Sequence, residues 1–168
     1  MPSLSYKDQF ATKVRTGEKS QTIRATRKVP IKQGDILYHF TRMRRPDCER
    51  LGYSIAEEVL AIDIFAQVGV TGPGVFLATG SAPDSGQRRL GHSEVRALAK
   101  ADGFDNMLEF YAWFVGGNKD HFTGHLIKWP TTWSPATCPK CGDNVADHKG
   151  RTLWCSSCNH NWKIGATS

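Results

Sequence analysis

The sequence has no apolar run long enough to span a membrane, and its first residues lack the hydrophobic segment of a secretory signal. We therefore expect a cytoplasmic protein without a membrane partner. Internal repeats and low-complexity tracts are missing as well. The 168 residues, 39% of them hydrophobic and 10% aromatic, suffice for one domain of ordinary size or for a smaller domain with an appendage.

Cysteine is scarce in most of the chain, because four of the five cysteines fall within the last 31 residues. A clustered set in a cytoplasmic protein favours metal binding over a disulfide scaffold. The fifth, Cys48, lies in a charged segment and has no partner nearby in the sequence. We treat Cys48 as incidental.

Acidic residues are sparse near the start of the chain. Residues 1–50 hold twelve lysines or arginines against five acids, a net charge of +7, whereas the whole chain carries +6. This excess favours a polyanion partner, because lysine and arginine contacts to phosphates release condensed counterions. Nucleic acid is the partner we expect, and solubility alone is the alternative explanation of the charge.

The segment Gly17–Arg24 combines a polar turn with a short alternating stretch. On a strand, Ser20, Thr22 and Arg24 share one face, and Lys19 lies where the turn meets the strand. This grouping suits two functions. It can hold a phosphate or a base edge by charge-assisted hydrogen bonds, or it can activate a hydroxyl beside an amine. The simplest alternative is a solvated edge strand.

The apolar spacing predicts helices capped by Ser5, Ser93 and Asp105. The charged segment 42–53 is expected to be a loop or a hairpin tip. Alternation and β-branched content predict strands over residues 20–25, 36–41, 59–68 and 122–129. The order of helix, strands, helices and strand predicts an α+β fold, a small β-barrel flanked by helices.

The tail carries two CxxC pairs separated by thirteen residues. Two-residue spacing lets successive thiolates bind one ion, and four sulfurs complete the tetrahedral shell of a structural zinc. We predict one structural Zn²⁺ in a four-cysteine zinc ribbon over residues 138–168, after a linker at 130–137. His148 and His160 are not needed as ligands. The predicted ligands are Cys138, Cys141, Cys155 and Cys158.

Three motifs in order resemble the ASCH domain family: Gly17–Arg24, then Gly34-Asp35 at the start of a strand, then Asp102-Gly103-Phe104 before a helix. That family belongs to the PUA-like β-barrel superfamily of RNA-associated folds. The resemblance implies an ASCH/PUA-like domain over residues 1–129, with the ribbon as an accessory. It also implies a cleft, formed by the first motif, that takes a nucleotide or an exposed base.

The resemblance further implies an alternative in which the protein is a hydrolase. One small bacterial member of the family is an amidohydrolase that removes the acyl group from acetylated cytidine. Its catalytic lysine, hydroxyl and acid fall by motif on Lys19, Thr22 and Asp102, although its acid is a glutamate. Lys19 would accept the Thr22 proton as that oxygen attacks a carbonyl, and Asp102 would assist. The alternative is a plain salt bridge between Lys19 and Asp102.

A ribonuclease is a further alternative, since ribonuclease activity has been attributed to some relatives. Lys19, Arg24 and Arg27 would then stabilise the charge on a phosphate during transfer. The sequence has no obvious histidine pair near the motif for acid-base cleavage, and His39 is the nearest candidate.

The preferred interpretation is a binding module for RNA or a nucleotide, without chemistry. Basic and polar groups would hold the backbone, and an aromatic ring would stack on a splayed base. The ribbon would add a contact through Lys149, Arg151 and Trp154, or would dock a protein partner that the sequence does not specify. The expected contact residues are Lys19, Ser20, Arg24, Arg27, Lys28, Arg44 and Tyr38, with Phe40 as an alternative ring.

Overall fold

The computed structural model describes residues 2–70, 72–80, 86–130, 132–143 and 147–165. The chain forms two compact units. The first unit comprises residues 1–18, 32–57 and 129–168, and the second comprises residues 19–31 and 58–128. The first unit therefore combines the start of the chain with the cysteine-rich tail, and the second holds the strand of the Gly17–Arg24 motif.

The first unit is built on a four-stranded sheet in the order β1-β3-β4-β9. β1 runs parallel to β3, whereas β4 is antiparallel to both β3 and β9. Helix α1 packs against β3 and β4 through its apolar side, which includes the buried Phe10 and Val14. The elements are Ser3–Tyr6 (β1), Asp8–Arg15 (α1), Ile36–Thr41 (β3), Glu49–Ile55 (β4) and Ser134–Pro135 (β9).

The expected helix cap at Ser5 is wrong. Ser5 lies in β1 and pairs with Phe40 of β3, and the helix begins only at Asp8. Leu4 and Tyr6 are buried because the chain here is extended, and an extended segment buries every second residue. The apolar residues from Tyr6 onward are spaced four apart, but Tyr6 belongs to β1 and only the later ones belong to the helix.

The expected loop over residues 42–53 is only partly correct. A turn occupies its first part, and β4 begins at Glu49. The charged residues at the start of this strand favoured a loop, although the second half of the strand is apolar and Leu51 and Tyr53 are buried there.

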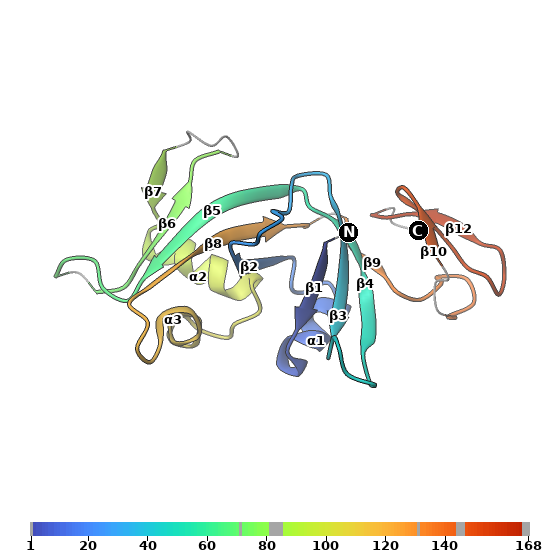
Figure 1. Ribbon diagram of the computed structural model, residues 1–168, viewed down its shortest axis with the longest axis horizontal. Coiled ribbons are helices and arrows are strands. Elements are labelled where there is room, and N and C mark those ends of the chain that lie inside the picture. The colour runs from blue at the N-terminus through green and yellow to red at the C-terminus, as the bar shows by residue number, and fades with distance from the viewer. Residues whose placement is uncertain (1, 71, 81–85, 131, 144–146, 166–168) are drawn as a thin grey trace. The chain divides into compact units, whose positions relative to one another are not determined.

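The second unit is built on a five-stranded antiparallel sheet in the order β2-β8-β5-β6-β7. Helices α2 and α3 lie on one face of β5 and β8 (Figure 1). Phe122 of β8 contacts Phe114 of α3, with ring centroids 4.8 Å apart, which identifies the covered face. The elements are Gln21–Ala25 (β2), Glu58–Phe65 (β5), Gly74–Ala78 (β6), Gln87–Arg89 (β7), His92–Ala101 (α2), Met107–Val115 (α3) and His121–Lys128 (β8).

The alternation within β5 separates the core of this unit from its surface. Leu60, Ile62 and Ile64 are buried, whereas Asp63 and Phe65 are only half-buried. Neighbouring residues of a strand point to opposite faces of the sheet. The helices therefore cover one face with aliphatic and aromatic side chains, and the other face keeps polar groups.

Both helices of this unit start at other residues than expected. The N-cap of α2 is Gly91, and Ser93 lies inside the helix. The N-cap of α3 is Asn106, whose side chain accepts a hydrogen bond from the backbone N–H of Glu109 at 2.9 Å. An asparagine caps a helix as well as an aspartate does, so Asn106, and not the neighbouring Asp105, is the N-cap.

The tail forms a three-stranded sheet that packs on the first unit's own core. Leu153 and Ile164 of the tail cluster with Tyr38, Tyr53 and Ile55. The predicted linker supplies β9, and the ring of Trp133 lies 5.1 Å from that of His39. The tail strands are Asp147–Lys149 (β10), Thr152–Trp154 (β11) and Asn161–Lys163 (β12).

The α+β class is confirmed, but the expected β-barrel is not closed. Within the described ranges, each sheet is an open row whose two outer strands do not pair with each other. Closure into a barrel requires the edge strands to pair along their length. The outer strands β9 and β7 have only two and three residues, which is too short for that pairing.

Candidate functional site

Lys19 and Asp102 form a buried ion pair in the second unit. Lys19 Nζ lies 2.6 Å from Oδ1 of Asp102 and also donates a hydrogen bond to the backbone carbonyl of Asp102. Only 3% and 4% of the two side chains are exposed. Lys19 precedes β2 and Asp102 is the C-cap of α2, so the pair joins the sheet to the helix.

Two side chains of the Gly17–Arg24 motif donate hydrogen bonds to backbone carbonyls at the C-terminal end of α2. Gln21 Nε2 donates to the carbonyl of Leu98 at 3.0 Å, and Lys19 bonds the carbonyl of Asp102. A lysine at this position complements the partial negative charge of a helix C-terminus and satisfies a carbonyl that has no partner within the helix. These contacts give the motif a structural role in holding α2 against β2.

Burial raises the pKa of the Asp102 carboxyl. The Lys19 ammonium, the charge of Arg24 and the backbone N–H of Ile23 all act in the opposite direction. A perturbed carboxyl beside a lysine is found in catalytic sites and in structural ion pairs alike. Because Nζ is shielded from solvent, the geometry here favours the salt bridge.

Thr22 lies on the other face of β2. Gln21 points towards α2, so its neighbour Thr22 points away from the helices, where it pairs with Ile127 of β8. Within the described part of the chain, the hydrogen bonds join Lys19 to Asp102 and leave Thr22 outside the pair. The structure thus brings together two of the three residues expected to be catalytic.

The face of the five-stranded sheet that points away from α3 is partly open to solvent. Phe122 contacts α3, so alternate residues of β8 lie on the opposite face together with their partners on β5 and β2. His121 and Thr123 are exposed there, and the other members are half-buried. We call this set the open sheet face: Arg24, Asp63, Phe65, His121, Thr123 and His125.

Asp63 organises the polar groups of the open sheet face. Its Oδ1 accepts hydrogen bonds from Thr123 Oγ1 at 2.7 Å and from His121 Nε2 at 3.0 Å, and its Oδ2 accepts one from Gln87 Nε2 at 2.8 Å. Burial tends to raise the pKa of Asp63, but the hydrogen bonds from Thr123, Gln87 and His121 outweigh it and lower the pKa. The resulting carboxylate fixes the orientation of the His121 ring.

The ring of His121 stacks on Phe65. Their centroids are 4.1 Å apart and their planes differ by 6°. Phe76 meets Phe65 edge-on, at 5.6 Å and 88°. The three rings form an aromatic cluster beside the Asp63 carboxylate, in which His121 is exposed and Phe65 and Phe76 are half-buried. An aromatic cluster with an exposed ring can stack an unpaired base.

The other expected contact residues are divided between the two units. In the second unit, Ser20 is half-buried, whereas Arg27 and Lys28 are exposed on the loop after β2. In the first unit, Arg44 is exposed in the turn before β4 and has a left-handed φ of 72°. Tyr38 is only 7% exposed and belongs to the cluster under the tail, so its ring offers no open face for a base.

His39 is fully buried in the first unit. Its Nδ1 is hydrogen-bonded to the Tyr6 hydroxyl at 2.9 Å, and its Nε2 is hydrogen-bonded to the Ser54 hydroxyl at 2.7 Å. The rings of Trp129 and Trp133 pack against it, at 4.7 and 5.1 Å. These contacts make His39 part of a satisfied core network rather than a surface acid or base.

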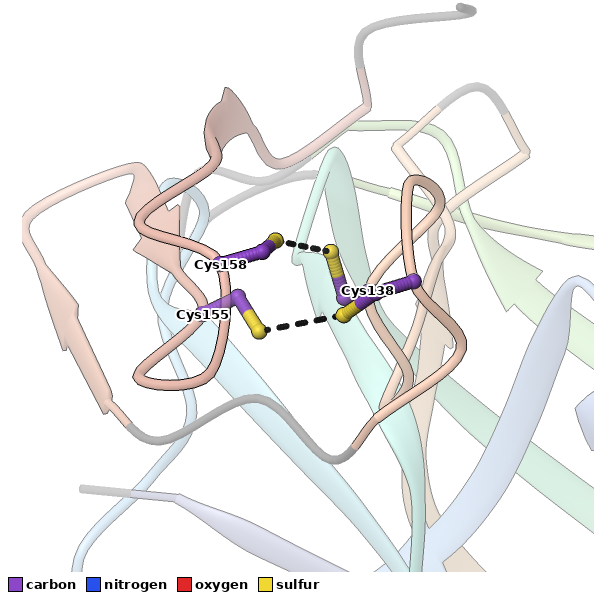
Figure 2. Close-up of side chains that lie close together, drawn as sticks. Cys138, Cys155 and Cys158 are labelled. Atoms are coloured by element: carbon purple, nitrogen blue, oxygen red, sulfur yellow. Dashed lines mark hydrogen bonds between the residues drawn. The ribbon is translucent and has the colours of Figure 1, made fainter.

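The four tail cysteines form one cluster. Their sulfurs all lie within 4.8 Å of one another, and the sulfurs of Cys138 and Cys158 are 3.7 Å apart and those of Cys141 and Cys155 are 3.5 Å apart (Figure 2). A disulfide would bring two sulfurs to about 2.0 Å. Thiolates placed tetrahedrally at about 2.3 Å from one ion lie about 3.8 Å from each other, which the observed spacing fits.

The two CxxC turns share one backbone arrangement. The amide of Gly142 donates to the carbonyl of Cys138, and the amide of Asn159 donates to that of Cys155, both at 2.9 Å. Gly142 and Asn159 follow the second cysteine of each turn and have left-handed φ values of 79° and 55°. Glycine and asparagine are the residues that adopt this conformation most readily. The repeated turn supports a preformed metal site.

The open sheet face was not predicted from the sequence. The expected strand over residues 122–129 contained the necessary signal, because Thr123 and His125 alternate with Phe122 and Leu126. The pairing with Asp63 and Phe65 could not be found in this way, since it depends on which strand lies beside β8.

The described residues contain no helix that is long and apolar enough to cross a membrane. No family model matches this chain, and no curated protein or solved structure is significantly similar to it. The chemistry and geometry of the sites therefore carry the functional inference.

Proposed function

We propose that this protein binds single-stranded RNA on the open sheet face. The observation that carries the proposal is the stacked pair of the exposed His121 and the half-buried Phe65, on a sheet whose other face is covered by helices. Proteins that read single strands combine such aromatic surfaces with basic residues along the backbone path.

The charge beside this surface has the sign that RNA requires. Residues 19–31, the first segment of the second unit, contain four basic residues and no acid. Arg24 lies on the open sheet face itself, and Arg27 and Lys28 are exposed on the loop that follows. Phosphates bound by this loop would direct the adjoining base towards the aromatic pair.

We also propose the finer assignments that the sequence suggests. An ASCH-like domain agrees with the position of the Gly17–Arg24 motif at the edge of a sheet beside α2. Zinc is the metal we assign to the cysteine cluster, because tetrahedral sites of four thiolates suit Zn²⁺ and leave no open position for catalysis. The cytoplasm, where thiols stay reduced, is the compartment that suits free cysteines.

The basic loop is tested by neutralising it. Arg27→Gln with Lys28→Gln should weaken binding of a short single-stranded RNA and flatten its salt dependence, because two phosphate contacts are lost. Each contact contributes about 0.7 to the slope of log affinity against log salt, so the slope should fall by about 1.4. Fluorescence anisotropy titrations over a range of salt concentrations measure both quantities.

The matched control is Arg96→Gln with Lys100→Gln, which removes the same charge from the exposed side of α2. This pair should leave the slope close to that of the wild type. Equal losses in the two double variants would show that net charge, and not the loop, attracts the RNA.

A second candidate is an amidohydrolase acting on an acylated nucleoside. The observation that favours it is the contact between Lys19 and Asp102, with the raised pKa of the carboxyl. The scheme also needs Thr22 as nucleophile, and Thr22 points away from the helices that the pair supports. RNA binding therefore ranks first. The ribonuclease alternative loses His39, the candidate acid or base nearest to the motif in the sequence, because that ring is buried.

A further inference from the structure

The first unit contains a groove whose lining shares only Phe40 with the sites expected from the sequence. It has a volume of about 450 Å³, within the range of small-molecule pockets. Its walls come from the end of α1, from β3 and β4, and from the segment that leads into the cysteine cluster. The residues that matter for its chemistry are Arg15, Phe40, Cys48, Glu49 and Arg50.

A β-bulge shapes one wall of this groove. Phe40 pairs with Arg50, but His39 pairs with Gly52, so Leu51 is an extra residue in β4. In a regular strand, Arg50 and Tyr53 would point to opposite faces. The extra residue turns Arg50 onto the face of Tyr53, and bulges commonly redirect side chains in this way at functional sites.

Arg50 is held in place by three contacts. Its Nη1 donates to the Tyr53 hydroxyl at 2.5 Å, and its guanidinium lies 5.6 Å from the centroid of Phe40 and 5.4 Å from that of Tyr53. A guanidinium has five N–H donors, and the Tyr53 bond occupies one of them. The planar guanidinium is therefore ordered before any ligand arrives, and its remaining N–H donors can bind a ligand.

The charges of the groove favour an anion. Arg15 pairs with Glu49 at 2.7 Å, so these two side chains compensate each other. Arg50 is then the uncompensated charge among the residues that line the groove. Arginine donors in a fork geometry match the oxygens of a phosphate, and the bond is charge-assisted.

We propose that this groove binds a phosphate-bearing ligand of nucleotide size, with its phosphate on Arg50. The groove is much larger than a phosphate ion needs, and the arginine is fixed against aromatic rings at its wall. The site lies wholly within the first unit, and it does not depend on RNA binding by the open sheet face.

Cys48 offers a direct test because it lines the groove and its thiol is exposed. Cytidine 5′-monophosphate should slow the alkylation of Cys48 by iodoacetamide, read by mass spectrometry of the peptide that contains it. Cytidine should give no protection, because it lacks the phosphate. Inorganic phosphate should protect less than the nucleotide, because it fills a small part of the groove.

Arg50→Gln should weaken the nucleotide's protection of Cys48 about tenfold, the effect of losing a charge-assisted hydrogen bond. Arg96→Gln, on α2, should leave protection unchanged. Arg50→Lys keeps the charge but not the planar fork, and should bind more weakly than the wild type. The proposal is overturned if cytidine protects as well as the nucleotide, if inorganic phosphate protects equally, if nothing protects, or if Arg50→Gln has no effect in a folded protein.

Discussion

Lys19→Met should destabilise the protein by about 3–5 kcal/mol, the cost of leaving one partner of a buried ion pair without its counter-charge. The carboxyl of Asp102 would remain buried, with the Ile23 N–H and the charge of Arg24 as its remaining support. The bond from Lys19 to the last turn of α2 would be lost at the same time. Urea unfolding, followed by circular dichroism, measures the change.

The free energy of unfolding that Lys19→Met loses should depend on pH. The pKa of Asp102 is raised in the folded protein above its ordinary value of 3.8, so folding favours the protonated carboxyl. The stability that protonation contributes is complete below pH 3.8 and is lost as the pH rises through the raised pKa. Without Lys19 the pKa should rise further, so the deficit of Lys19→Met should grow from acid to neutral pH.

Two comparisons make this prediction specific. Lys19→Met combined with Asp102→Asn should recover most of the loss, because no uncompensated charge stays buried. Lys128→Met removes a lysine that lies 2.6 Å from Glu58 in a half-exposed pair, and should cost no more than about 1 kcal/mol. If Lys19→Met and Lys128→Met cost the same, the pair at the end of α2 has no special structural weight.

The same variants separate structure from catalysis. In the structural account, Lys19→Met lowers stability, and neither it nor the wild type hydrolyses acetylated cytidine. Turnover by the wild type that disappears in folded Lys19→Met would instead establish the amidohydrolase scheme, and would require Thr22 and Lys19 to meet in a rearranged site.

Metal removal should unfold the tail. A segment of about 30 residues buries too little surface to fold alone, and a structural zinc supplies about 10–16 kcal/mol in comparable peptides. Leu153 and Ile164 would then leave the cluster that contains Tyr38 and Tyr53. We expect a chelator to expose this apolar surface, seen as binding of a hydrophobic dye and as loss of amide protection in residues 147–165.

Cysteine variants provide the control for this experiment. Cys155→Ser should reproduce the effect of the chelator, whereas Cys48→Ser should change neither the metal content nor the fold, because Cys48 lies outside the cluster. Elemental analysis should find one zinc per chain. A tail that keeps its amide protection after complete removal of the metal would contradict the structural role of the ion.

The features that the sequence predicted well are those set by local spacing. The two CxxC pairs predicted the cysteine cluster, and alternation predicted β2, β3 and β8 to within a residue or so. Ser5 failed because β1 is held by its parallel pairing with β3, a contact between distant segments. The barrel failed for a similar reason, since closure depends on the length of edge strands that no local pattern reveals.

The candidate site shows the same limit. The motif gave Lys19 and Asp102 as partners, and they do meet. Tyr38 had the pattern of an exposed ring on a strand, but the tail packs over its sheet and buries it. His121 and Phe65 stack only because β5 and β8 are neighbours, and they lie 56 positions apart in the sequence.

The most direct test of RNA binding by the open sheet face is the affinity of Phe65→Leu for a short single-stranded RNA, measured by anisotropy at fixed salt. We predict a loss of about 1–3 kcal/mol, or about fivefold or more, because stacking on the ring is lost while an apolar side chain remains. Trp113→Leu, which removes an exposed ring from α3, should bind as the wild type does. Absence of binding by the wild type, or unchanged affinity in Phe65→Leu, would contradict the proposal.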